Sequence, residues 1–217
     1  MNSVEHVVYR LRNADIRQYP FPHFYILDVF PAEFYQTILK SLPPDCDYDG
    51  TKFANRLLGT ECPEFMEPFD NSWFAQNVIY SFGQNAFYTR YPYKGSTPQF
   101  RWEWRLIRDS EGYAIGPHTD APHKVISLLF YLPPDETMRD MGTSIFMPDD
   151  HVKTCRGGPH HKFSGFSEVW RAPFLPNSCL GFWKTDNSWH GVPKIDKIVT
   201  RNVLLYNVYE IGADKAP

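Results

Sequence analysis

The sequence predicts a mostly β protein in which N-terminal helices support an antiparallel sandwich or barrel. Six short runs of β-type residues, separated by turn residues, follow one another from Phe100 onward. The composition agrees, because aromatic residues make up 17% of the chain and the 19 prolines mark turns. With 217 residues, no repeat and no Gly/Ser-rich linker, we expect one domain over 1–217.

Residues 1–99 are predicted to supply an N-terminal strand and supporting helices. The aromatic-rich segment 20–28 predicts a short strand, and 31–42 predicts a helix whose first turn contains Pro31. Phe34, Ile38 and Leu42 are spaced by four and therefore share one face of that helix, which we expect to pack on a sheet. A second helix is expected around 73–84.

Residues 100–210 are predicted to form the β core. The expected strands cover 100–108, 125–132, 143–148, 167–172, 178–184 and 201–209. The stretch 149–168 inside this core lacks periodicity, and a connection of such length predicts a functional loop.

The charge balance and the apolar segments favour a cytoplasmic protein. The formal net charge of -3 gives no reason to expect nucleic acid or an anionic membrane as a partner. No apolar stretch has the length of a signal peptide or a membrane helix. The scattered cysteines predict reduced thiols, and they are Cys46, Cys62, Cys155 and Cys179.

The segment Gly116-Pro117-His118-Thr119-Asp120 places an imidazole and a carboxylate two residues apart. In an extended chain such side chains point to the same face, so both can reach one metal ion. His190, in Ser188-Trp189-His190-Gly191, offers a third ligand from a distant segment. Two histidines and one carboxylate leave coordination positions free, which is the arrangement typical of non-haem Fe(II) oxygenases.

Arg201 is the predicted anchor for a co-substrate. A dicarboxylate that chelates iron through its keto acid end leaves a far carboxylate, which a guanidinium meets with two hydrogen bonds. Alternation within 125–131 places Ser127, Leu129 and Tyr131 on one face, and we assign that face to the pocket because it carries hydroxyls. Tyr131 is then able to share the far carboxylate.

These residues resemble the prolyl-4-hydroxylase-like branch of the 2-oxoglutarate/Fe(II) oxygenase superfamily. The similarity rests on PFPHFYILDVF, GYAIGPHTDAPHKVISLLFYLPP, MGTSIFMP and PNSCLGFWKTDNSWHGVPKI followed by Arg201. The resemblance implies a double-stranded β-helix, a jelly-roll or cupin-like barrel, with the 149–168 insert near its mouth, where it covers or recognises the substrate. It also implies that His118, Asp120 and His190 bind iron, that Tyr131 and Arg201 hold 2-oxoglutarate, and that Arg108 faces the co-substrate.

The activity implied by the resemblance is hydroxylation of a C–H bond with release of succinate and CO2. It requires Fe(II), 2-oxoglutarate and O2, with ascorbate in support. Because Asp120 occupies the carboxylate position, no place is left for a halide, so hydroxylation is favoured over halogenation. Free or peptidyl amino acids and other small molecules are the substrates to consider, and the fold does not choose among them or set an oligomeric state.

Three other interpretations stay open at this point. A cupin-type metal protein that does not use 2-oxoglutarate would leave Arg201 and Tyr131 without a role. A non-catalytic binding module of the same fold would not need the intact ligand set. A zinc site in the insert is conceivable by ligand type but matches no strong spacing pattern, and its ligands would be His151, Cys155, His160 and His161.

Overall fold

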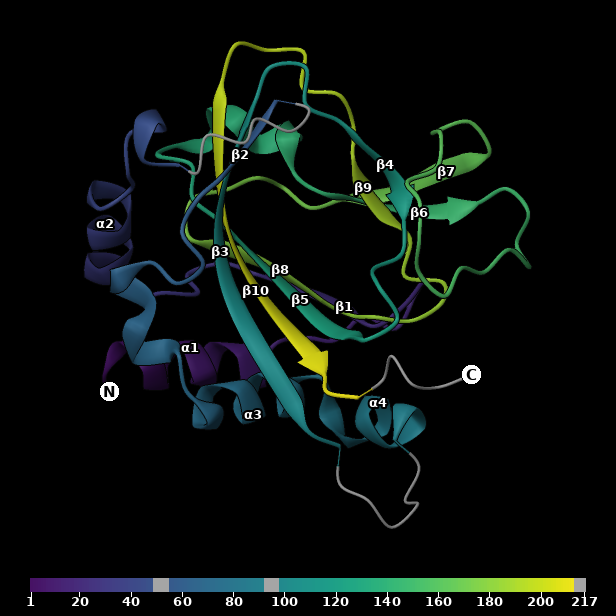
Figure 1. The fold of residues 1–217 in the computed structure, drawn as a ribbon, viewed down its shortest axis with the longest axis horizontal. Coiled ribbons are helices and arrows are strands. Elements are labelled where there is room, and N and C mark those ends of the chain that lie inside the picture. Colours follow the sequence, from purple (N-terminus) through teal and green to yellow (C-terminus); the bar gives the residue numbers. More distant parts are fainter. Residues whose placement is uncertain (49–54, 92–97, 213–217) are drawn as a thin grey trace.

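The computed structural model describes residues 1–48, 55–91 and 98–212, which are built around two antiparallel sheets (Figure 1). A six-stranded sheet has the order β1-β8-β5-β10-β3-β2, and a four-stranded sheet has the order β4-β9-β6-β7. The strands are β1 (His23–Ile26), β2 (Arg56–Leu58), β3 (Phe100–Ser110), β4 (Ile115–His118), β5 (Lys124–Tyr131), β6 (Ser144–Pro148), β7 (Phe166–Arg171), β8 (Ser178–Trp183), β9 (His190–Val192) and β10 (Thr200–Glu210).

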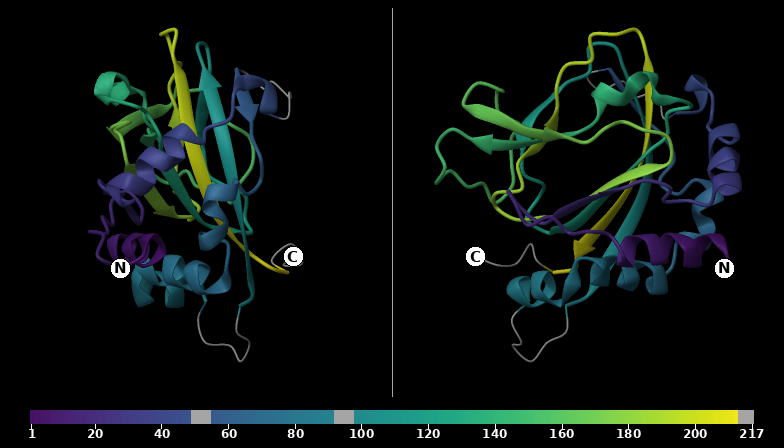
Figure 2. Two further views of the ribbon diagram at one scale, coloured as in Figure 1. Left: turned by 90° about the vertical axis from the view of Figure 1, so that its left-hand side faces the viewer. Right: turned by 180° about the vertical axis from the view of Figure 1, so that it is seen from behind.

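The α-helices lie against the face of the six-stranded sheet that is turned away from the four-stranded sheet (Figures 1 and 2). Their apolar side chains form one core with the outward residues of β3, β5 and β10. Phe74 of α3, for example, packs its ring 5.8 Å from Trp104 and 5.3 Å from Tyr206. The helices are α1 (Ser3–Arg12), α2 (Ala32–Lys40), α3 (Ser72–Ser81) and α4 (Gly83–Arg90), with 3-10 helices at η1 (Asp45–Asp47), η2 (Glu64–Phe69) and η3 (Glu136–Met141).

A second core fills part of the space between the sheets. Tyr131, Leu180, Phe182 and Val203 of the six-stranded sheet meet Ile145 of the four-stranded sheet there. Strand alternation divides the two cores, because successive side chains of β5 and β10 point to opposite faces. The helix-covered face of the large sheet is therefore apolar, whereas its inner face is free to carry polar residues.

The prediction of a mostly β fold supported by N-terminal helices is confirmed. The finer prediction of a closed barrel is not: in the parts of the chain that the structure describes, no strand pairing joins the two sheets.

All six predicted core strands are present, with small differences at their ends. β2, β4 and β9 were not predicted, since each has four residues or fewer and shows no clear alternation. The helix expected at 73–84 is two helices, α3 and α4, which meet at Phe82. α1 was also not predicted, although Asn2 and Glu5 form a capping box at its start.

Two further features concern the membrane and the thiols. No helix within the described ranges is both long and apolar enough to cross a bilayer. All four cysteines are free, in agreement with the prediction of reduced thiols.

Candidate metal centre

His118 and His190 face each other from neighbouring strands. His118 ends β4, His190 begins β9, and the two are direct partners in the antiparallel register. Their ring centroids are 4.3 Å apart. His118 Nδ1 lies 3.0 Å from the carbonyl oxygen of Gly116, and His190 Nδ1 lies 2.9 Å from that of Ser188. Because a carbonyl only accepts, Nδ1 carries the proton in both rings, and each Nε2 keeps its lone pair for a metal.

Asp120 reaches the two histidines from the loop after β4. Its Oδ1 is 4.0 Å from His190 Nε2, and one ligand atom from each of the three residues lies within 4.8 Å of the others. Ser127 donates a hydrogen bond of 2.8 Å to Oδ2, and Lys124 donates one of 3.1 Å to Oδ1. The chain is not a strand at Asp120, since β4 ends at His118, so these two hydrogen bonds orient the carboxylate instead.

Burial and neighbouring charges set the protonation states of the three groups. Burial lowers the pKa of His118 to about 3, with a further contribution from nearby His190. Burial also lowers the pKa of His190. For Asp120 burial alone would raise the pKa, but the charge of Lys124 and the two imidazoles bring it below its usual value. At neutral pH the site therefore holds two neutral imidazoles and a carboxylate, the forms that bind a divalent transition metal.

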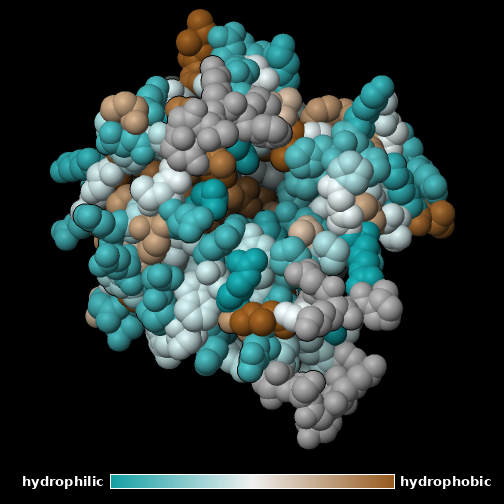
Figure 3. Space-filling view, in the orientation of Figure 1, coloured by the Kyte–Doolittle hydropathy of each residue, from teal (hydrophilic) through white to brown (hydrophobic). Residues whose placement is uncertain are grey.

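A cavity of about 130 Å³ opens beside these residues, between the two sheets. Figure 3 shows a hollow near the centre of this face of the molecule, with hydrophobic residues inside it. Of the three residues predicted to face the pocket from β5, Ser127 and Leu129 line it, together with His118, Asp120 and His190, whereas Tyr131 does not. Arg201 also lines it, with 1% of its surface exposed, so the structure brings the predicted guanidinium and the predicted metal ligands to one cavity.

Several polar groups around this cavity have no hydrogen-bond partner. They are Arg201 Nε, the Tyr113 hydroxyl, the Thr143 hydroxyl and Asn207 Oδ1, all buried and all on lining residues. A buried polar group without a partner costs about 1–3 kcal/mol, so a run of them around one cavity fits a polar ligand. The donors suit carboxylate oxygens.

Tyr131 and Arg108 lie outside the lining of this cavity. Tyr131 is fully buried behind it, and its hydroxyl accepts a hydrogen bond of 3.1 Å from the Thr143 backbone N–H. Arg108 donates to Asn202 Oδ1, to the Pro43 carbonyl oxygen and to the Asp45 carboxylate. The functional roles given to these two residues stay predictions.

Sequence reasoning did not single out Arg56, Asp109, Tyr113 or Lys124, which also line the cavity. Asp109 does not stand out in the pattern, because the same strand also carries Arg101, Glu103, Arg105 and Arg108. Arg56 does not stand out either, since it lies in the 45–100 region, where the sequence shows few structural signals.

The connection 149–165 packs against the segment that carries His118 and Asp120. The Thr119 hydroxyl donates to the Cys155 carbonyl oxygen at 2.7 Å, and the ring centroid of His160 lies 4.4 Å from that of His118. A Cβ at Gly157 would lie 2.6 Å from the Asp120 carbonyl oxygen. This connection is therefore fitted closely to the segment that carries His118 and Asp120, and its predicted place at the mouth of the site stays a prediction.

The structure offers the insert zinc site no support. Within the described residues, His118, Asp120 and His190 are the one group of three or more ligand-type side chains close enough to share a metal. His161 instead packs its ring against Trp189 at 5.2 Å.

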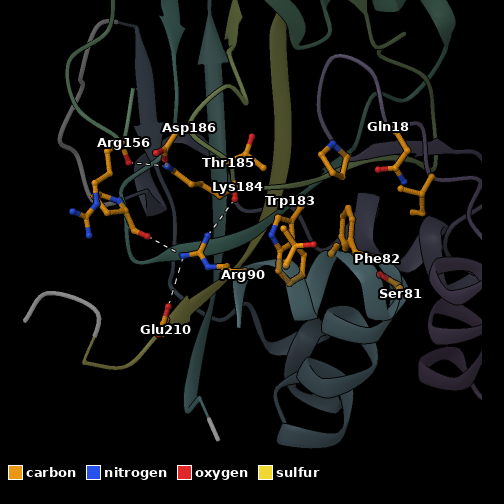
Figure 4. Close-up of a pocket in the computed structure, with 16 residues that line it drawn as sticks. Gln18, Ser81, Phe82, Arg90, Arg156, Trp183, Lys184, Thr185, Asp186 and Glu210 are labelled. Carbon is orange, nitrogen blue, oxygen red and sulfur yellow. Dashed lines mark hydrogen bonds and ion pairs between the residues drawn. The ribbon is translucent and has the colours of Figure 1, made fainter. Parts of the chain in front are cut away.

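A larger cleft, about 1310 Å³, lies apart from this centre and shares no lining residue with it. Figure 4 shows how Arg90 spans it, donating to the carbonyl oxygens of Pro122 and Lys184 and lying 3.8 Å from Glu210. Lys184 in turn donates to Asp186. The candidate metal ligands lie in the smaller cavity, so we place the chemistry there.

We predict that replacing His118 or Asp120 with Ala abolishes stoichiometric binding of Fe(II), or of Mn, Co, Ni or Zn in its place, because two ligands alone hold such ions weakly. Elemental analysis after metal loading and desalting measures this. His160→Ala is the matched control and keeps its metal, since His160 is close to the site but outside the ligand group. Parent-like metal content in both ligand variants would contradict the assignment.

A second prediction concerns the contact between the connection and the ligand loop. Gly157→Ala should weaken metal binding by about tenfold although all three ligands remain, because the new methyl group displaces the backbone of Asp120. Gly158→Ala is the control: its φ of +153° matches the +140° of Gly157, but a Cβ there meets no atom within 4 Å. Competition with a fluorescent chelator measures both affinities, and equal values would refute the proposed contact.

Comparison with known proteins places the chain by fold. No protein-family model and no curated protein matches the sequence. Among solved structures, a prolyl 4-hydroxylase from Phytophthora capsici is similar with a TM-score of 0.62 and 13% identity, over 97% of this chain and 66% of that one. A prolyl-4-hydroxylase from Pseudomonas putida is similar with a TM-score of 0.57 and 11% identity, over 95% and 98%.

The epimerase SnoN, solved with Fe3+, alpha-ketoglutarate (2-oxoglutarate) and nogalamycin RO, is similar with a TM-score of 0.52 and 10% identity. The match covers 95% of this chain and 83% of SnoN. The resemblance noted in the sequence is thus confirmed at the level of structure: the chain has the fold of the 2-oxoglutarate/Fe(II) oxygenases.

Proposed function

We propose that this protein is a non-haem Fe(II) oxygenase that uses 2-oxoglutarate and hydroxylates a C–H bond of its substrate, releasing succinate and CO2. One observation carries the proposal. The His118, Asp120 and His190 group and the buried guanidinium of Arg201 line the same small cavity. The similar structures agree, since they include prolyl hydroxylases and a protein solved with iron and 2-oxoglutarate.

In this proposal His118, Asp120 and His190 hold the iron, and Arg201 binds the far carboxylate of 2-oxoglutarate. When bound, the iron and its co-substrate supply the oxidising power for C–H cleavage. The protein contributes binding and orientation. At about 130 Å³ the cavity is below the roughly 300–1,000 Å³ of pockets for drug-sized ligands, so it suits the co-substrate, while the main substrate approaches from the mouth.

Tyr131 has a supporting place in this scheme. Its ring and the Arg201 guanidinium both lie against Phe174, at 4.6 and 4.7 Å. Since its hydroxyl accepts from the Thr143 N–H, its own hydrogen is free to donate. We assign no role to Arg108, because its donors are engaged by Pro43, Asp45 and Asn202.

The connection 149–165 is proposed to form the wall that the substrate meets. It brings the His160 ring to 4.4 Å from that of His118, and much of it is exposed to solvent. A wall next to the metal excludes water and positions the substrate, so its residues act on coupling rather than on metal binding.

The cupin-type alternative gains one observation from the structure. Arg201 already has a protein partner, because its Nη1 donates to Asp109 Oδ2 at 2.8 Å. In a metal protein that does not use 2-oxoglutarate, this pairing with Asp109 would be the reason for the arginine. The two functions differ in whether 2-oxoglutarate binds and is consumed.

The direct test is release of succinate from 2-oxoglutarate in the presence of Fe(II), O2 and ascorbate. Free amino acids, proline-containing peptides and cell extract are the substrates to screen. We expect slow succinate release alone and faster release with the true substrate. Asp120→Ala is the control for adventitious iron chemistry, and equal rates in parent and control would reject the oxygenase.

Arg201→Ala should weaken 2-oxoglutarate binding at least about a hundredfold, because an unpaired buried carboxylate costs roughly 3–5 kcal/mol and each ~1.4 kcal/mol is tenfold. Metal binding should survive, as Arg201 is not a ligand. Arg201→Lys should fall between, because an ammonium keeps the charge but loses the two-pronged geometry. The measurement is an oxygen-free titration of the Fe(II)-loaded protein, following the visible charge-transfer band. Parent-like binding by the alanine variant would remove Arg201 as the anchor.

A further inference from the structure

A row of three charged side chains crosses the inner face of the large sheet. Arg56 on β2 is the register partner of Asp109 on β3, and Asp109 is the register partner of Arg201 on β10. Cross-strand partners point to the same face of a sheet, so the three groups lie side by side. The order of charges along the row is plus, minus, plus.

The contacts within this row are short and buried. Arg56 Nε donates to Asp109 Oδ1 at 2.6 Å, and Arg201 Nη1 donates to Asp109 Oδ2 at 2.8 Å. The side chain of Asp109 is fully buried, that of Arg201 is 1% exposed and that of Arg56 is 22% exposed. All three residues line the cavity beside the metal group.

The row carries an excess positive charge only because Arg56 is present. Asp109 and Arg201 alone make a neutral pair, which attracts an anion weakly. With Arg56 the row has two guanidinium groups on one carboxylate, and its net charge becomes +1. Arg201 alone already pairs with Asp109, so charge pairing of that carboxylate does not by itself require the second arginine.

Two hydrogen-bond donors in or next to the row have no protein partner and could bind an anion. Arg201 Nε and the Tyr113 hydroxyl are buried without a hydrogen-bond partner, and both belong to residues that line the cavity. The guanidinium of Arg56 lies 4.3 Å above the Tyr113 ring, a cation–π contact that holds this tyrosine in place. Arg56 thus acts on the ligand end of the row through Asp109 and through Tyr113.

We propose that Arg56 is a positioning residue that makes the site selective for a 2-oxo acid with a second carboxylate, because it balances Asp109 and leaves the charge of Arg201 for the ligand. This inference rests on the proposed use of 2-oxoglutarate. β2 is an edge strand outside the predicted β core, and the inference gives it a role in selecting the co-substrate.

The test is calorimetric titration of Mn(II)-loaded protein without O2. The ligands are 2-oxoglutarate and 2-oxobutyrate, which has the same keto acid end but no second carboxylate. Arg56→Met should weaken 2-oxoglutarate binding about tenfold or more and leave 2-oxobutyrate binding unchanged. The double variant Arg56→Met/Asp109→Asn should return to within about threefold of the parent, because its row again has a net charge of +1.

Arg105→Met is the control for a general loss of positive charge, since Arg105 lies on the same strand as Asp109 but outside the cavity and pairs with Glu61. It should bind both ligands as the parent does. If Arg56→Met unfolds, as judged by circular dichroism, Arg56→Lys replaces it, and its 2-oxoglutarate affinity should lie near that of the parent.

The outcomes separate this inference from the proposed function. A parent that binds 2-oxoglutarate, with an Arg56→Met variant that binds it equally well, overturns the role of Arg56 alone. A weakened single variant that Asp109→Asn does not rescue overturns the charge-balance argument. A parent that does not bind 2-oxoglutarate overturns the proposed function and this inference together.

Discussion

The antiparallel pairing of β4 with β9 sets His118 opposite His190, and the rest of the candidate site is arranged around this pair. Close approach of the two strands depends on Gly191, where a Cβ would lie 2.6 Å from the Ile115 carbonyl oxygen. β9 also pairs with β6, which fixes its position in the small sheet. Phe182 of the large sheet packs its ring 4.4 Å from that of His190. The two imidazoles are therefore fixed before any metal arrives, and only the Asp120 loop needs further support.

The large sheet supplies that support because one of its faces packs against the helices and the other carries polar residues toward the site. On β5 the outward side chains join the helix-packed core, while Ser127 points inward and donates to Asp120. On β10 Leu204 and Tyr206 are outward, while Arg201 and Val203 line the cavity. Burial of aromatic side chains on the helix side stabilises the sheet. The inner face can then carry buried charges that contribute little to stability on their own.

Sequence reasoning succeeded where the pattern was local and long. The alternation in 125–131 predicted which face of β5 meets the cavity, and Ser127 and Leu129 line it. It failed for β4 and β9, which are too short to show a period, although both carry proposed ligands. It also missed the row of Arg56, Asp109 and Arg201, because cross-strand neighbours are set by sheet order, and β2 joins β3 across a long sequence separation. The metal ligands were found through motif chemistry rather than through periodicity.

The charges around the cavity explain why a dianionic co-substrate suits this fold. Three cationic side chains line it, Arg56, Lys124 and Arg201, against two anionic ones, Asp109 and Asp120. The cavity therefore carries a net charge of +1, with neutral imidazoles, and a divalent metal would raise this to +3. A dicarboxylate lowers it to +1 again, with one carboxylate for the metal and one for the arginine row. A monoanion would leave a larger excess charge in a buried space, which is costly. The same electrostatic balance thus favours metal and dicarboxylate binding together, each improving the site for the other.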